Sequence, residues 1–468
     1  MVNWTTYVDR KRQILVICCV LTFLHVYISI SNYTEDDTVA KSSGAFRDHD
    51  FIDTLQEFEW NNLLAAYKNK KLDASNFSFW YSKLLMVLTP WIVMPPKVAV
   101  NTNTSCNSPP PLKFPFNAPP CNRLKGGSRK VAALFQLGFD ADTLEIHLHE
   151  LDKLVDKFFI IESTATYYLG VQKPLIWELL RRQPRFEIFV HKVVHFVLDD
   201  QELLVAQLEA LESENGGADA RPHSIEILQE RMRWLKFVEW NTMTKTFNIN
   251  DLVGFGDVDE VPNRNVVHYL KECEMPSDPI DIATWFPFGR IDQAFQTDAP
   301  VRGHIYSLGN PTYWTLKTAM NYNGKKYSFT SVPSRLRGHS PGFIIGGMHM
   351  TEYGYFPFTL NKLLTIIEGF KTQVQSRIAS KIEFVMDELR INISTNMSAA
   401  DKNRAFANME TELAKTPAHF LHRIIKVSDL KLKNENEFRM LVQLPWFYDC
   451  NRERYPAWEG KHDNRLDV

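Results

Sequence analysis

The amino-acid sequence predicts an α/β protein with a mixed, mainly parallel sheet, preceded by a single transmembrane helix and a stem. Strand-length apolar runs alternate with amphipathic helical stretches from residue 131 onward, and a proline-rich segment separates them from an apolar run near the N-terminus. The apolar content of 44% and the aromatic content of 12% are typical of a globular chain. A formal net charge of -2 argues against a nucleic-acid-binding protein, which needs a basic surface.

The N-terminal apolar run, residues 14–30, is expected to be a type II signal anchor. Basic residues 10–12 precede it and acidic residues 35–37 follow it, which places residues 1–13 in the cytosol and the remainder in the lumen. A helix of this length reaches about 25 Å, which suits a thin bilayer of the secretory pathway. The alternative is a cleaved signal peptide, because small residues stand at a suitable spacing for cleavage.

Glycosylation sequons and cysteines agree with a luminal body. The sequons begin at Asn32, Asn76, Asn103, Asn392 and Asn396. Outside the apolar run, which holds Cys18 and Cys19, the cysteines form an even set of four: Cys106, Cys121, Cys273 and Cys450. Four thiols allow three pairings. We favour Cys106 with Cys121, by proximity along the chain, and therefore Cys273 with Cys450.

Residues 31–128 are expected to form a luminal stem that ends in a proline-rich linker. Within it, "LLMVLTPWIVMPP" is too short to span a bilayer and is interrupted by Pro90, so it is expected to pack on the protein or on the membrane surface. The composition changes at Gly126 and Gly127, after which regular structure begins. We therefore expect a catalytic-sized domain at 129–455 and a C-terminal tail at 456–468.

The start of this domain has the pattern of a βαβ unit. A buried strand at 131–137 is followed by a helix that opens at a capping box, Asp142 to Glu145, and by a second strand at 157–163. Such a unit predicts parallel strands with a right-handed crossover. Further on, a long helix is expected at 223–247, and the next strand ends in an acidic turn. Hairpins are expected at about 280–350 and helices after residue 360.

The acidic turn is the stretch "GFGDVDEVP", which holds three carboxylates within four positions. Asp257 and Asp259 lie two apart on an extended chain, so both side chains can reach one hard cation. Mg²⁺ and Mn²⁺ favour one or two carboxylates, with phosphates completing the shell. The pattern predicts a divalent-ion site for a diphosphate at the carboxyl edge of the sheet. The alternative is an acidic turn that faces water, with Glu260 either binding an acceptor hydroxyl or capping the turn.

Three separated stretches resemble glycosyltransferase family 17. They are "FQLGFDADTLEIHLHELDKLVDKFFIIESTATYYLGVQKPLIWE", "FGDVDEVPNRNVVHYLK" and "GGMHMTEYGYFPFTLNKLL". The resemblance covers roughly residues 130 to 370 and implies a GT-A-like nucleotide-sugar-binding domain in a Golgi membrane enzyme of the single-pass type II kind. It also implies an inverting, Mn²⁺-dependent or Mg²⁺-dependent transfer from UDP-N-acetylglucosamine to a mannose of a glycoprotein N-glycan.

The resemblance assigns expectations to individual residues. Asp257 and Asp259 match the acidic motif and, with His349, are expected to hold the metal. His349 stands at the family's "GWH", which reads Gly347-Met348-His349 here. The alternative for this imidazole is a hydrogen-bonded structural residue.

Glu162 and Ser163 stand at the family's "ES", where they are expected to bind the ribose, and Lys173 stands at its "KP", where it is expected to meet a phosphate. The alternatives are a helix cap or ion pair for the glutamate and a solvated surface position for the lysine.

Inversion needs a general base that takes the proton of the acceptor hydroxyl. Asp292 and Glu352 are the candidates, and Arg290 is expected to steady the donor diphosphate. Each of the three could instead be an ordinary surface or ion-pair residue.

The function expected is thus N-acetylglucosaminyl transfer in N-glycan processing. Two alternatives stay open, another donor or acceptor on the same scaffold and a catalytically silent luminal glycan-binding protein. The expected partners are the UDP-sugar, the N-glycan acceptor and the membrane, with a homodimer left open and no nucleic acid.

Overall fold

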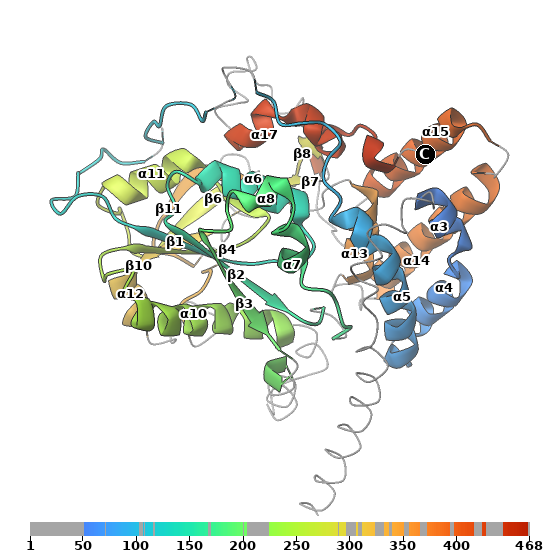
Figure 1. Ribbon diagram of the computed structural model, residues 1–468, viewed down its shortest axis with the longest axis horizontal. Coiled ribbons are helices and arrows are strands. Elements are labelled where there is room, and N and C mark those ends of the chain that lie inside the picture. The colour runs from blue at the N-terminus through green and yellow to red at the C-terminus, as the bar shows by residue number, and fades with distance from the viewer. Residues whose placement is uncertain are drawn as a thin grey trace, which may run out of the picture. The chain divides into compact units, whose positions relative to one another are not determined.

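The structure is a computed structural model that describes residues 51–466, with gaps. The gaps are residues 71, 103–105, 107, 116–117, 167–169, 200, 204–223, 289, 296–305, 308–310, 323–331, 337–338, 351–354, 366–371, 394–396, 416–423 and 427–442. From Leu55 onward the chain forms one compact unit. In this unit a central sheet has helices on both faces, and a group of helices lies beside it (Figure 1).

The central sheet has nine strands in the described part of the chain, in the order β3-β2-β1-β4-β10-β6-β11-β5, with β9 paired to β6. They are β1 (Val131–Gln136), β2 (Lys157–Ser163), β3 (Val193–Leu198), β4 (Leu252–Asp257), β5 (Glu260–Pro262), β6 (Ile280–Trp285), β9 (Tyr306–Ser307), β10 (Thr312–Thr315) and β11 (Phe343–His349). A second, three-stranded sheet contains β7 (Pro287–Phe288), β8 (Arg290–Phe295) and β12 (Ile424–Lys426).

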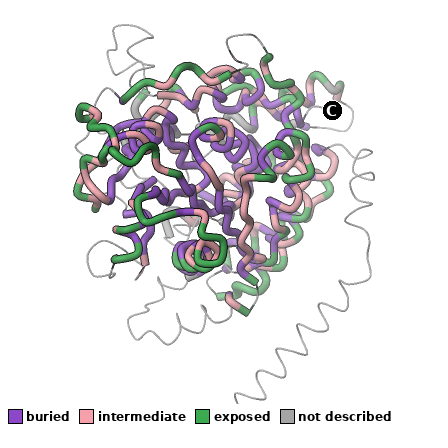
Figure 2. Tube along the Cα trace, turned by 60° about the vertical axis from the view of Figure 1, so that its left-hand side comes forward, coloured by how far each residue is buried: buried purple, intermediate pink, exposed green. Residues whose placement is uncertain are grey.

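Helices cover the sheet because its strands are apolar on both faces. β1 is buried at every position, and its side chains alternate between the two faces. Ala132 and Leu134 pack with Trp234 and Phe237 of α10 (Ser224–Thr244), whereas Phe135 meets His147 of α6 on the other face. Buried residues fill the interior of the compact part of the chain, and exposed residues lie toward its periphery (Figure 2).

The helices around the sheet are short except for α10. They are α6 (Ala141–Leu151), α7 (Ile176–Leu180), α8 (Pro184–Glu187), α11 (Arg264–Glu272), α12 (Leu316–Met320) and α17 (Trp446–Cys450). The βαβ unit is confirmed as β1-α6-β2, although α6 begins after Asp140 and the expected capping-box residue Glu145 is engaged elsewhere.

The sheet is mixed, as predicted, but the prediction that it is mainly parallel is wrong. Only β3, β2, β1 and β4 form a continuous parallel set, since β10 lies antiparallel between β4 and β6, and β5 lies antiparallel to β11. Apolar alternation identifies a strand but not its direction, so the sequence could not separate the two kinds of pairing.

The predicted fold class also included a preceding transmembrane helix. Among the described residues, no helix is both long and apolar enough to cross a membrane. The expected anchor at 14–30 and cytosolic tail at 1–13 lie outside the described residues.

The residues expected as the stem instead form helices that pack against the C-terminal part of the chain. α4 (Trp60–Asn69) packs on α14 (Thr372–Asp387), and α5 (Ala74–Ile92) packs on α13 (Phe356–Thr365). Gln56 of α3 (Phe51–Glu57) donates to the Leu389 carbonyl of η3 (Glu388–Asn392) at 2.9 Å, and α15 (Ala399–Lys415) packs on α13 and η3. Tyr81 donates from its hydroxyl to Asn361 Oδ1 (2.8 Å), and Lys68 pairs with Glu383 (2.6 Å). The apolar stretch around Pro90 therefore packs on the protein, because it forms the end of buried α5.

The four cysteines form two disulfides, but the favoured pairing is wrong. Cys106 is bonded to Cys450, and Cys121 to Cys273. Proximity along the chain misled the prediction, because Arg123 forms a β-bridge with Cys273 and so brings Cys121 beside α11. Both ends of the proline-rich linker are thereby fixed to the compact unit.

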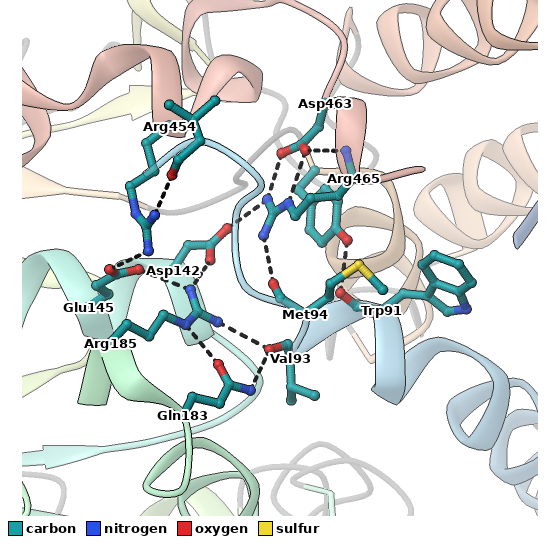
Figure 3. A network of polar contacts seen from close by, with 12 residues as sticks. Trp91, Val93, Met94, Asp142, Glu145, Gln183, Arg185, Arg454, Asp463 and Arg465 are labelled. Carbon is teal, nitrogen blue, oxygen red and sulfur yellow. Dashed lines mark hydrogen bonds and ion pairs between the residues drawn. The ribbon is translucent and has the colours of Figure 1, made fainter. Parts of the chain in front are cut away.

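The C-terminal residues 456–466 are anchored in the interior by a network of ion pairs (Figure 3). Arg465 is fully buried and pairs with Asp142 of α6 (2.8 Å) and with Asp463 (2.6 Å). Arg185 joins Asp142 to Glu145, and Arg454 contacts Glu145 from the C-terminal side. This network fixes the N-terminal turn of α6 to the last residues of the described chain.

Candidate active site

The acidic turn lies where the carboxyl ends of the parallel strands meet. It is fixed from two sides, because the Val258 amide donates to the Gln136 carbonyl of β1 (3.2 Å) and the Met350 amide donates to the Asp259 carbonyl (2.6 Å). The Asp257 amide donates to Glu260 Oε2 (2.8 Å), which closes the turn. The carboxylates are therefore held at defined positions at this edge of the sheet.

Arg335 is the positive group that lies among these carboxylates. Its side chain is 3% exposed, and Nη1 contacts both Asp257 Oδ2 and Glu260 Oε1, the latter at 2.9 Å. Its Nε donates to Glu230 Oε1 of α10 (2.7 Å). One guanidinium thus relieves the repulsion between Asp257 and Glu260 that the sequence pattern raises.

A second guanidinium, Arg233 of α10, extends the cluster. It pairs with Glu230 and donates from Nη1 to the Gly256 carbonyl (2.7 Å). Carboxylates nonetheless outnumber arginines, since Arg335 is also 3.6 Å from Glu226. Burial raises the pKa of Asp257 to about 7; Arg335 opposes this effect, and the neighbouring carboxylates add to it.

Asp259 faces a different pair of cations. His349 Nε2 lies 3.5 Å and Lys362 Nζ 3.9 Å from Asp259 Oδ2. The pairing of Glu260 with His349 between β5 and β11 explains this proximity. Burial raises the pKa of Asp259, but the positive charges of His349 and Lys362 have the larger effect and lower this pKa below its usual range. Burial lowers the pKa of His349, but the negative charge of Asp259 has the larger effect and raises it.

Asp140 is a site carboxylate that sequence reasoning missed. It precedes α6, and its Oδ1 is buried without a hydrogen-bond partner among the described residues. Burial raises its pKa to about 6, with Lys362 lowering and Asp259 raising it, so the three groups are close enough to interact. Because Asp140 stands in an ordinary helix-start position, nothing in its spacing marks it.

The expected donor residues of β2 lie in a buried network of their own. Glu162 accepts from the Ile176 amide (2.7 Å) and the Trp177 amide (2.8 Å), and so caps α7. Lys173 Nζ lies 3.2 Å from its carboxylate. Ser163 Oγ donates to the Ala165 carbonyl (2.5 Å). The helix-cap and ion-pair alternative thus describes Glu162 as the structure places it. Lys173 is buried in this ion pair, so the solvated surface position that was its alternative is wrong.

Among the described residues, no interaction brings Arg290 or Asp292 to the acidic turn. Arg290 and Asp292 lie on β8 of the second sheet and pair with each other at 2.9 Å, with the aspartate side chain 55% exposed. Arg290 lies against Gly460, where an added Cβ would come within 2.5 Å of the guanidinium. Glu352 lies outside the described residues.

The expected metal ligands Asp257, Asp259 and His349 are neighbours, but they do not form a three-ligand set. In the part of the chain that the structure describes, no group of three or more His, Cys, Asp and Glu side chains is placed to hold a metal ion. Two atoms of the expected ligands, His349 Nδ1 and Asp257 Oδ1, are buried with no hydrogen-bond partner among the described residues. Because Mg²⁺ and Mn²⁺ need only one or two carboxylates when phosphates complete the shell, this oxygen fits a divalent ion that arrives with a diphosphate.

In open α/β sheets, ligands bind at the carboxyl ends of the strands. The buried acidic turn at this edge therefore places the chain in the class of ligand-binding α/β proteins. Comparison with known proteins shows what this region resembles. Residues 123–283 match the model of glycosyltransferase family 17, which confirms the resemblance found in the sequence. The matched region contains the acidic turn and the β1-α6-β2 unit.

Curated relatives agree at low identity. The β-1,4-mannosyl-glycoprotein 4-β-N-acetylglucosaminyltransferases of Rattus norvegicus and Homo sapiens are each 26% identical to this chain over 177 residues, which is 37% of this chain. The alignment spans 30% of the length of these relatives. A solved mannosyltransferase from Pyrobaculum calidifontis, in complex with GDP-Man and Mn²⁺, aligns over 86% of this chain and 97% of its own at 9% identity, but its TM-score of 0.25 is too low to support an argument.

Proposed function

We propose that this chain transfers N-acetylglucosamine from UDP-N-acetylglucosamine to a mannose of an N-glycan, with inversion at the sugar carbon. The observation that carries the proposal is the acidic turn, held at the carboxyl edge of the sheet inside the region that matches glycosyltransferase family 17. The names of the curated relatives support the donor and the acceptor.

The residues of the turn suit a diphosphate that leaves with negative charge. Lys362 is a cation beside Asp259, and the Asp259 charge favours the protonated form of His349 by raising its pKa, so both side chains can stabilise the charge of the leaving diphosphate. A divalent ion held by Asp257 Oδ1 and by the donor phosphates would supply further charge neutralisation. Arg335 keeps Asp257 and Glu260 in place, so that the turn stays ordered between turnovers.

We propose Asp140 as the general base in place of Asp292. A base must accept a proton near neutral pH, and a carboxylate with a pKa of about 6 and an unpartnered oxygen is suited to this task. Asp292 is exposed and pairs with Arg290 on the second sheet. Among the described residues, no interaction connects Asp292 to the acidic turn.

The compartment proposed is the lumen of the secretory pathway, and the Golgi in particular. The support is the pair of disulfides, because such bonds form and persist in oxidising compartments.

The test follows UDP release by the full chain from a panel of UDP-sugars, with and without an N-glycan acceptor, in Mn²⁺ and in EDTA. We expect release from UDP-N-acetylglucosamine that rises when the acceptor is added. Asp259→Asn is expected to lower kcat at least a hundredfold, whereas Asp292→Asn serves as the matched control and is expected to leave kcat within twofold.

Asp140→Asn tests the base, and it is expected to lower kcat with little change in KM. Release from another donor would overturn the donor proposed here. A folded chain that releases UDP from no donor would overturn the proposed transfer and favour a silent glycan-binding protein.

A further inference from the structure

A cavity lies among the helices beside the sheet, between the turn that joins α3 to α4 and the segment where α14 continues into η3. Its volume is about 570 Å³, which is typical of small-molecule sites. The helices α3, α4 and α14 lie together at the side of the sheet in Figure 1. Among the described residues, no interaction connects the lining of this cavity to the acidic turn, so the proposed function does not account for it.

The buried part of the lining is apolar, and the exposed part is polar. Trp60, Leu389 and Ile393 line the cavity and are 1–6% exposed. The exposed lining residues are Glu59, Asn61, Asn62 and Arg390. The cavity thus combines an apolar surface with polar groups that solvent reaches.

The turn between α3 and α4 is held in place without a ligand. Trp60 Nε1 donates to the Leu55 carbonyl (2.7 Å), and the Phe58 ring meets the Trp60 ring edge to face, with centroids 5.1 Å apart. Gln56 Nε2 donates to the Leu389 carbonyl (2.9 Å), which ties the turn to η3. The Phe58 ring, which also lines the cavity, is therefore positioned in advance.

Several polar groups of the lining have hydrogen-bonding capacity that no described residue uses. Asn62 donates from Nδ2 to Glu59 Oε2 (2.5 Å), which leaves Asn62 Oδ1 and Glu59 Oε1 as acceptors. The side chains of Asn61 and Arg390 have no polar partner among the described residues. Acceptors and donors are thus both present, and a polar ligand can replace the water that meets them.

We propose that this cavity is a second, non-catalytic site that binds a neutral oligosaccharide, the part of the acceptor glycan remote from the reacting sugar. A sugar hydroxyl both donates and accepts, so it can use the amides, the carboxylate and the guanidinium together, whereas a simple ion uses only one kind. Glu59 and Arg390 carry opposite charges, so the lining has no net charge that would select an ion. The Phe58 ring and the buried apolar side chains suit the C–H faces of a sugar ring.

The position suits an acceptor that is longer than the sugar that reacts. α4 packs on α14, and α13, which precedes α14 in the chain, carries Lys362, whose Nζ lies 3.9 Å from Asp259 Oδ2. One group of helices thus forms the cavity and supplies a cation to the acidic turn. The inference rests on the proposed function, because it takes an N-glycan to be the acceptor.

The test compares the double variant Asn61→Ala/Arg390→Ala with wild type in the full chain. A neutral N-glycan released from its protein is titrated by calorimetry without donor, the Tm is measured without ligand, and UDP release is followed with the same glycan. We expect the affinity for the glycan to fall about tenfold or more, because hydrogen bonds from an amide and a guanidinium are lost. The Tm should not change, because both side chains are exposed.

The matched control is Arg404→Ala, which removes an exposed arginine that does not line the cavity. This variant should leave both the glycan affinity and the Tm as in wild type.

A glycan affinity of the double variant within twofold of wild type would overturn the inference and leave the proposed function standing. A lowered Tm would also overturn it, because the two side chains would then stabilise the fold rather than bind a ligand. Weakened glycan binding in the double variant, in a protein that releases no UDP from any donor, would support the binding site and refute the proposed transfer. No glycan binding by the wild type would overturn the inference.

Discussion

Replacing Arg335 tests whether the protein neutralises its own acidic turn. The guanidinium contacts Asp257, Glu260 and Glu230, and its side chain is 3% exposed. Removing one partner of a buried ion pair costs about 3–5 kcal/mol, because a charge remains buried without compensation. We therefore expect Arg335→Met to lower the free energy of unfolding by about 3–5 kcal/mol at pH 7.5, measured by urea denaturation.

The loss should depend on pH in a defined direction. Burial already raises the pKa of Asp257 to about 7, and without Arg335 this pKa must rise further. A carboxyl group with a raised pKa binds its proton more tightly in the folded state, so its contribution to stability falls as pH rises above the ordinary carboxyl range. The loss of unfolding free energy in Arg335→Met should thus be larger at pH 8 than at pH 5, and millimolar Mn²⁺ should reduce this loss.

The control is Arg404→Met, which breaks an exposed pair with Asp401 at 3.4 Å. Surface pairs of this kind contribute about 0–1 kcal/mol, so the control should unfold almost as wild type does at both pH values. A deficit in Arg335→Met below about 1 kcal/mol, or one that is equal at pH 5 and pH 8, would refute the reasoning.

Three further predictions concern stability. Arg465→Met, which removes the fully buried partner of Asp142, should also cost about 3–5 kcal/mol in urea unfolding, and a loss no larger than that of an exposed arginine would contradict the network of Figure 3. Burial raises the pKa of Glu150 to about 8, so its contribution to the free energy of unfolding falls between about pH 4.5 and pH 8, by about 1.4 kcal/mol per pH unit. Glu150→Gln should therefore flatten the dependence of the unfolding free energy on pH in that window, and an unchanged slope would contradict this prediction. The double variant Cys106→Ser/Cys450→Ser should lose about 2–5 kcal/mol, and peptide mapping of the wild type should recover this pair rather than Cys106 with Cys121.

The parallel half of the sheet was predictable from local pattern. The runs at β1, β2 and β4 are short, apolar and buried, and the helix between β1 and β2 has the expected periodicity. Because carboxyl ends of parallel strands meet at one edge, the location of the acidic turn followed from the same pattern. The antiparallel insertion of β10 was not predictable, since its pairing partners β4 and β6 lie far earlier in the chain.

The counter-ions of the turn illustrate why the site was only half predictable. The sequence shows three carboxylates together, but Arg335 follows Glu260 by 75 positions and reaches it only through the fold. The sequence pattern pointed to a metal ion as the compensating charge. Electrostatics requires a positive charge beside buried carboxylates but does not specify its chemical form, and here arginine, histidine and lysine side chains supply it.

Glu162 shows how a motif match and a chemical role can separate. Its carboxylate has the position that the family motif suggests, yet it accepts hydrogen bonds from two backbone amides of α7 and pairs with Lys173. A carboxylate that caps a helix in the interior cannot turn to a ribose without leaving those amides unsatisfied, which is costly. The expected contact of Glu162 with the ribose therefore stays a prediction, and such a contact must overcome the energetic cost of leaving the two amides of α7 unsatisfied.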